Sequence, residues 1–166
     1  STKDLGVGIT IIDGAISRLS SASPAISKAM VLSTGAAFSS NMNTLVQKTK
    51  FLVELINLPL AEDTVIEAFD LVENGVWGIS SSGDVIDFGI TSSLAIASLE
   101  RDITQDMKYI FVAGALTDRF LNLVGNSGNI KNVTLVVRDF TKIFVNEMLY
   151  RNFVSRGGRI KKKKKS

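Results

Sequence analysis

The chain has 166 residues, of which 45 % are hydrophobic and 21 % are charged, and it contains neither histidine nor cysteine. This length suits one domain with its own hydrophobic core, and the composition excludes a disordered or collagen-like chain. Without histidine and cysteine, a serine–histidine triad, thiolate catalysis and a zinc site built on those ligands are excluded. We therefore expect a protein that is not an enzyme and that carries no cofactor.

The net charge of +3 is distributed unevenly along the chain. Lys161 to Lys165 supply five of the 19 Lys and Arg residues, so residues 1–160 carry 14 cationic against 16 acidic side chains, a net charge of −2. A mildly acidic body with a basic end favours an interaction arm over a basic binding face. The N-terminus lacks the pattern of a secretory signal. We expect synthesis in the cytosol, and the final location stays open, with a place in a particle as one option.

Helical patterns dominate the first half of the chain. Residues 2–20 carry isoleucines at helical spacing, and a second helix is expected over residues 23–40, where Ser23 is a potential N-cap followed by proline. Residues 44–58 and 61–75 are two further amphipathic segments, which end at a proline and a glycine. Each of these segments predicts a helix.

The second half of the chain is more mixed. Residues 76–89 predict a β-hairpin, because two runs rich in β-branched and aromatic residues flank a Ser-Gly-Asp turn. Helical spacing returns in residues 91–103, 104–125 and 132–158. The last segment begins with alternating residues, so that its start is compatible with a strand. The pattern as a whole predicts a mainly α-helical, single-domain bundle with a small β-hairpin, and the alternative is an α+β domain with a few more strands.

We expect the single helical domain to cover residues 1–158 and a basic, flexible C-terminal arm to cover residues 159–166. Adjacent lysines repel one another, and burial does not normally compensate for this repulsion. The expected partner of the arm is nucleic acid, contacted through phosphates without base readout. An anionic membrane is the alternative partner, and a solvating tail or an engineered tag would have no specific role. The candidate anion-binding residues are Arg156, Arg159, Lys161, Lys162, Lys163, Lys164 and Lys165.

The segment over residues 61–75 is strongly acidic and contains no lysine or arginine. In a helix, Asp63, Glu67 and Asp70 would share one face. A solvated surface is the simplest interpretation of this face, and a docking surface for the lysine arm of a second subunit is the functional one. A hard-cation site would need further carboxylates, such as Asp84 and Asp87, to converge on this face. No metal site is therefore predicted.

These features together predict a structural or assembly subunit, of a viral or phage-like kind, that forms a homo-oligomer. Helices that are apolar over more than one face support self-association, and the lysine arm supports contact with nucleic acid. Two other functions stay open from the sequence: a membrane-active or pore-forming helical protein, and a metal-dependent phosphoryl-transfer enzyme. No small-molecule substrate is indicated.

Overall fold

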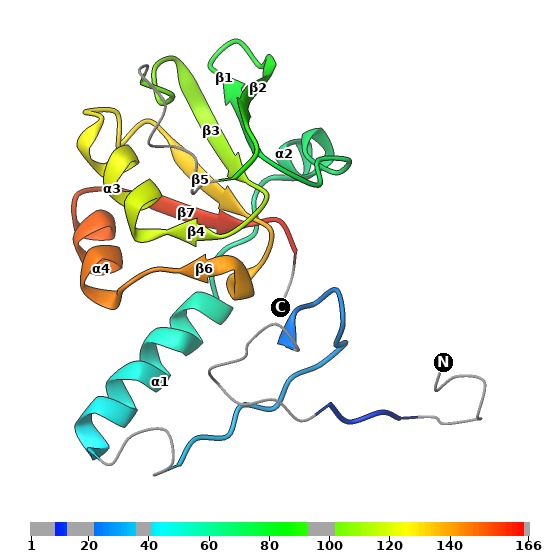
Figure 1. Cartoon of the computed structure of the whole chain (residues 1–166), viewed down its shortest axis with the longest axis vertical. Helices are drawn as coiled ribbons and strands as arrows, with labels where there is room; N and C mark the ends of the chain where they lie inside the picture. Colours follow the sequence, from blue (N-terminus) through cyan, green and yellow to red (C-terminus); the bar gives the residue numbers. More distant parts are fainter. Residues whose placement is uncertain (1–8, 13–21, 36–40, 93–101, 165–166) are drawn as a thin grey trace.

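The computed structural model of the chain describes residues 9–12, 22–35, 41–92 and 102–164 (Figure 1). At its centre lies a five-stranded mixed sheet with the strand order β2-β1-β3-β5-β7. Strand β1 is antiparallel to β2 and to β3, whereas β3, β5 and β7 run parallel to one another. The bounds of these strands are β1 Val76–Ser80, β2 Val85–Ile90, β3 Met107–Val112, β5 Thr134–Val137 and β7 Arg159–Lys162.

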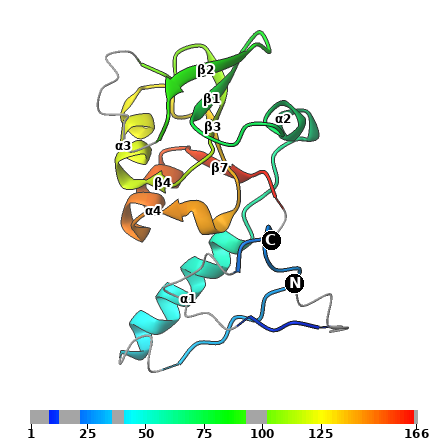
Figure 2. The same ribbon diagram turned by 45° about the vertical axis from the view of Figure 1, so that its right-hand side comes forward.

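Helices connect the parallel strands and cover both faces of the sheet. Helix α3 joins β3 to β5 and helix α4 joins β5 to β7, as expected for crossovers between parallel strands. In Figures 1 and 2, α3 and α4 lie on one side of the sheet and α2 lies on the other. The bounds of the remaining elements are α1 Met42–Ile56, α2 Asp63–Ala68, β4 Leu116–Thr117, α3 Asp118–Asn126, η4 Phe140–Lys142, β6 Ile143–Phe144 and α4 Glu147–Ser155. Strands β4 and β6 pair as a separate two-stranded parallel sheet.

Side-chain caps explain where three of the helices begin. Asn41 accepts a hydrogen bond from the third residue of α1, Thr117 accepts one from the third residue of α3, and Asn146 accepts one from the second residue of α4. These side chains satisfy backbone amides that have no partner inside the helix. The short polar residues before each apolar segment therefore determine the first turn.

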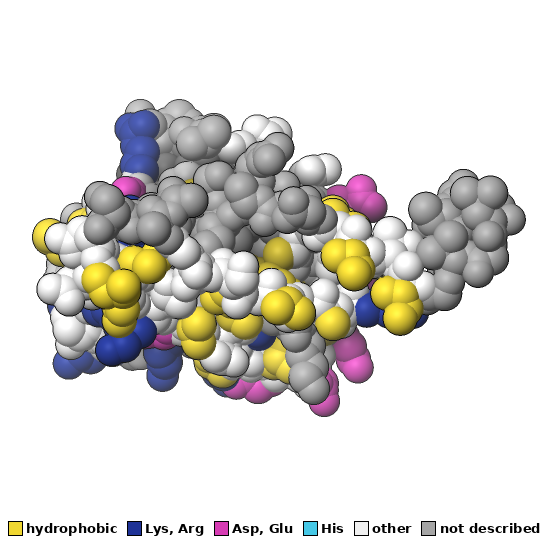
Figure 3. All heavy atoms as spheres, turned by 90° about the horizontal axis from the view of Figure 1, so that it is seen from below, with side chains coloured by type: hydrophobic (Ala, Val, Ile, Leu, Met, Phe, Trp, Pro, Cys, Tyr) yellow, Lys and Arg dark blue, Asp and Glu magenta, His cyan; other side chains and the backbone are white. Residues whose placement is uncertain are grey.

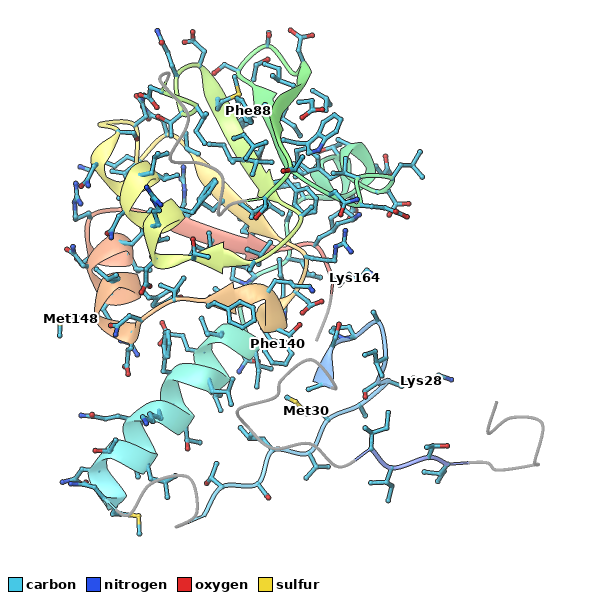
Figure 4. The ribbon with its side chains drawn as sticks, viewed as in Figure 1. Lys28, Met30, Phe88, Phe140, Met148 and Lys164 are labelled. Atoms are coloured by element: carbon cyan, nitrogen blue, oxygen red, sulfur yellow. The ribbon has the colours of Figure 1, made fainter. Side chains whose placement is uncertain are left out.

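The sheet separates two hydrophobic clusters. The larger one lies on the side of α3 and α4 and includes Ile110, Leu135 and Phe140, the last of which is labelled with the side chains in Figure 4. The smaller one packs α2 against the other face of the sheet. There Phe69 stacks on Phe111 of β3, with ring centroids 4.9 Å apart. Helix α1 contributes two of its buried leucines, Leu52 and Leu55, to the larger cluster.

The predicted helical bundle is wrong, because the architecture is α/β. Residues 104–125 and 132–158 were each expected to be helical, with a strand as the alternative at the start of the second segment. Each contains two strands and a shorter helix, and the start of the second segment is the strand β5. The reason is that β5 is buried at all four positions and β3 at most of its positions, since both sheet faces are covered. Such strands carry nearly continuous apolar runs, in which some residues fall at helical spacing by chance.

The predictions for the first half of the chain have mixed outcomes. The helix over residues 44–58 and the hairpin over residues 76–89 are confirmed as α1 and as β1 with β2, while the segment 61–75 contains only the short α2. The helix expected from Ser23 is wrong, because residues 22–35 form turns and extended chain. The expected helices over residues 2–20 and 91–103 fall largely outside the described residues.

Candidate anion-binding groove

Residues 159–164, which we expected to be a flexible arm, form β7 and the bend after it. Strand β7 pairs with β5 along its length. The pairing continues beyond β7, where the Lys163 amide donates to the carbonyl of Val137 at 2.8 Å and the Lys164 amide donates to that of Arg138 at 2.9 Å. On the other edge of β7, the backbone of Lys162 exchanges two hydrogen bonds with the backbone of residues 59–61. The first four lysines of the run are therefore held by backbone hydrogen bonds.

Two lysines of this run are buried and link both helical layers to the sheet. The exposed fraction is 5 % for Lys162 and 9 % for Lys163. The Lys162 amine donates to the carbonyl of Ile56 at the end of α1, and burial lowers its pKa. The Lys163 amine donates to the carbonyl of Phe69, at 2.7 Å, and lies 3.4 Å from the Asp70 carboxylate. These two amines anchor the ends of α1 and α2 to the edge of the sheet.

The predicted acidic face lies on and directly after α2. Asp63, Glu67 and Asp70 are exposed, and Asp70 pairs with Lys163 of the same chain. The lysine run and the acidic segment therefore meet within one chain, whereas the predicted contact joins two subunits. A role of this face in docking a second subunit stays a prediction. Among the described residues, no group of three or more acidic side chains is arranged to hold a metal ion.

Of the remaining predicted anion-binding residues, Arg156, Arg159 and Lys164 are described. The guanidinium of Arg156 donates to the carbonyl of Gly125 at 2.6 Å, and that of Arg159 donates to the carbonyl of Lys131 at 2.8 Å. Lys164 is exposed at the end of the sheet, as labelled in Figure 4. Lys165 lies outside the described residues.

Two adjoining hollows lie on the sheet face that carries α2. The first has a volume of about 310 Å³ and lies between α2 and the turn of the β1–β2 hairpin, and the second has a volume of about 160 Å³ and lies over β5 and β7. Both are lined by Lys108 and Tyr109, so we treat them as one feature, the basic groove. The second hollow is lined by Glu62, Lys108, Tyr109, Asn132, Thr134, Arg159 and Lys161.

The strand register places the lining residues on one face. Tyr109 of β3 is opposite Thr134 of β5, which is opposite Arg159 of β7. Lys161 is two positions beyond Arg159 and therefore points to the same face. Adjacent strands are roughly 4.8 Å apart, so the three intervals from β1 to β7 span roughly 14 Å. The basic groove thus runs across the strands, with Tyr109 near its middle.

The basic groove carries a local excess of positive charge. Among its described lining residues, Lys108, Arg159 and Lys161 are cationic and Glu62 is the carboxylate, a net charge of +2. The Lys161 amine forms an ion pair with Glu62 and donates a hydrogen bond to its carboxylate, which lowers the pKa of the Glu62 carboxyl. Burial, and then the hydrogen bond with Glu62, raise the pKa of Tyr109, whose phenol stays protonated at neutral pH. The groove already holds one oxyanion from its own chain.

Part of this set is predictable from the sequence and part is not. Arg159 and Lys161 were predicted to bind anions, but Lys108, Tyr109 and Asn132 were not singled out. Lys108 and Tyr109 are a cation and an aromatic residue side by side, a combination that suits nucleic-acid contacts. The sequence pattern predicted a helix for this segment. In a helix Tyr109 would not lie beside Thr134 and Arg159, which strand pairing brings next to it.

Comparison of the chain with protein-family models found no match. Comparisons with curated proteins and with solved structures also returned no significant match. Within the described residues, no helix is both long enough and apolar enough to cross a membrane. The geometry of the groove and of the exposed surfaces is therefore the basis for assigning a function.

Proposed function

We propose that this protein is a non-enzymatic assembly subunit that binds an anionic polymer, nucleic acid, in the basic groove. The observation that carries this proposal is the convergence of Lys108, Arg159 and Lys161 around Tyr109, from two strands that are not adjacent in the sheet. Phosphate contacts from lysine and arginine supply most of the affinity of sequence-independent nucleic-acid binding. Lys108 and Arg159 are exposed, so their charged ends can reach a backbone that lies in the groove.

The form of the groove favours a polymer over a small ligand. Small-molecule sites usually enclose most of the ligand surface in one concave, largely apolar cavity. Here two hollows follow one another across the strands, and cations occur both at their junction, at Lys108, and towards the edge of the sheet, at Arg159 and Lys161. Positive charge that is spaced along a track matches an extended backbone with regularly repeated phosphates.

Exposed apolar residues on α1 support the assembly part of the proposal. This helix extends away from the body of the molecule (Figures 1 and 2). Its residues Met42, Val46 and Val53 are 70 %, 42 % and 41 % exposed, and their spacing of four and seven places them on one stripe. Figure 3, which views this end of the molecule, shows hydrophobic side chains at several points of the surface. A second copy that covers this stripe would remove apolar surface from water.

The groove is tested with a labelled oligonucleotide, whose fluorescence anisotropy is followed over a range of salt concentrations. Lys108→Gln and Arg159→Gln should each weaken binding and reduce the slope of log affinity against log salt by about one unit. Glu62→Gln should tighten binding, because it removes the negative charge of the groove. The matched controls are Lys50→Gln on α1 and Arg119→Gln on α3, which remove exposed cations outside the groove. Equal losses in groove and control variants would contradict the proposal.

Self-association is tested by light scattering after size exclusion, over a range of protein concentrations. We expect an oligomer for the natural chain and a shift to monomer for Val46→Glu and Val53→Glu. Val154→Glu on α4 is the matched control, because Val154 is 43 % exposed and lies on another helix. A natural chain that stays monomeric at all concentrations, or a control that dissociates equally, would refute the role of the α1 stripe.

A further inference from the structure

The basic groove has an aromatic residue at its centre, and this feature identifies the form of nucleic acid that fits. Resting on the proposed function, we infer that the groove binds single-stranded nucleic acid and that one unpaired base stacks on Tyr109. The ring is half-buried and lines both hollows of the groove. It therefore lies where a strand that follows the cations must pass.

The position of the Tyr109 ring is fixed by its surroundings. Its backbone lies in β3 between β1 and β5, where Ile79 and Thr134 are its opposite neighbours. Its phenol lies near Glu62, the residue that pairs with Lys161, and this carboxylate contributes to the raised pKa of Tyr109. A half-buried ring on a central strand that is paired on both sides loses little freedom when a base stacks on it, which favours binding.

The residues around the ring complement a nucleotide. The Lys108 amine lies over the Tyr109 ring, 5.7 Å from its centre. A base that stacks on this face would take the place of the amine, which would then contact a phosphate next to the stacked base. Towards β7, the groove is lined by the amide of Asn132 and by Thr134. An amide can donate to and accept from the edge of an unpaired base, and a hydroxyl can do the same. The ring, the cation and the polar groups lie along one track.

A duplex uses this arrangement less well than a single strand. Bases in a duplex are already stacked on one another, so they are not available to an aromatic side chain. A duplex can offer phosphates to Arg159 and Lys161 but cannot place a base on Tyr109. The groove should therefore prefer a single strand to a duplex at equal salt concentration, and it should prefer a strand with bases to the same backbone without them.

The experiment compares four labelled or competing probes at one salt concentration: a single-stranded oligonucleotide, its duplex, an abasic single strand of equal length, and inorganic polyphosphate. We expect the natural chain to bind the single strand about tenfold more tightly than the abasic strand. Tyr109→Leu should remove this difference, because it weakens binding of the single strand more than binding of the abasic strand, whereas Tyr109→Phe should keep most of the difference. Circular dichroism and thermal unfolding show whether each variant is folded, and the comparison of probes on the natural chain needs no variant.

The outcomes separate this inference from the proposed function. If the natural chain binds none of the four probes, the proposed function fails and the inference fails with it. If it binds all probes with similar affinity, or prefers the duplex, the groove is an anion site and the inference is overturned. A preference for bases that survives in folded Tyr109→Leu would also overturn it, because the base would then stack elsewhere.

Discussion

Gly158, directly before β7, has no space for a side chain, and this allows a quantitative prediction. A Cβ atom at this position would lie 2.3, 2.4 and 2.6 Å from three carbons of the Phe153 ring. Ordinary contacts begin near 3.4 Å, so the ring would have to withdraw by roughly 1 Å. Phe153 is only 3 % exposed and belongs to the larger core cluster, which leaves it no free direction. Gly158→Ala should therefore cost about 1–3 kcal/mol, the usual range for overpacking.

Thermal and urea unfolding measure this cost. For a chain of this size, each kcal/mol lowers Tm by roughly 2–4 °C, so we expect a decrease of roughly 2–12 °C. Gly114→Ala is the matched control, because no atom lies within 4 Å of its added Cβ, and its stability should be unchanged or slightly increased. Adding Phe153→Leu to Gly158→Ala should recover part of the loss, since the two substitutions are coupled. If Gly158→Ala is as stable as Gly114→Ala, the packing argument is refuted.

Three further predictions concern charged groups. The hydrogen bond from Lys161 lowers the folded pKa of Glu62. The ionised carboxylate therefore stabilises the fold above its ordinary pKa of 4.5, and this contribution is lost as pH falls through the folded pKa. The unfolding midpoints of Glu62→Gln and the natural chain should converge in acid. Burial lowers the folded pKa of Lys162 below its ordinary value of 10.5. Between the folded pKa and 10.5 the folded state binds fewer protons than the unfolded state, so its stability rises with pH in this range. Urea midpoints of Lys162→Met should lack this rise, and an unchanged rise would contradict the assignment. Asp139 is 1 % exposed and accepts a hydrogen bond from the Thr141 amide at 2.9 Å. Asp139→Ala leaves that buried donor unpaired and should lower the free energy of unfolding in urea by about 1–3 kcal/mol. Asp139→Asn should cost less, because its amide oxygen can still accept the hydrogen bond.

The candidate site could be predicted from the sequence only in part. The lysine run marked Arg159 and Lys161 as anion-binding candidates, because consecutive cations are visible without any fold. Tyr109 and Thr134 are 25 positions apart in the chain, and only the parallel pairing of β3 with β5 makes them neighbours. Glu62 enters the groove because it precedes α2, which packs on the same sheet face. Those contacts depend on strand register, which local patterns do not specify.

Local signals were sufficient for α1 and for the β1–β2 hairpin. Leucines at helical spacing before Pro59 indicate α1, and a Ser-Gly-Asp turn between β-branched runs indicates the hairpin. Both elements are stabilised by contacts between residues that are close in the sequence. The absence of histidine and cysteine also limits the possible chemistry, and this is visible from the sequence alone.

Only the tertiary structure decided that residues 107–112 and 134–137 are strands and that the basic C-terminal segment is part of the sheet. Strands β3 and β5 are apolar on both faces because helices cover the sheet from both sides, and the sequence pattern of such a strand resembles that of a buried helix. The lysine run was expected to stay in solvent, since charge repulsion opposes its burial. In the fold, its backbone completes the sheet edge, while Glu62, Asp70 and the carbonyls at the ends of α1 and α2 accept its amines. Those partners lie 93 to 106 positions away along the chain, so that only the folded arrangement brings them within reach.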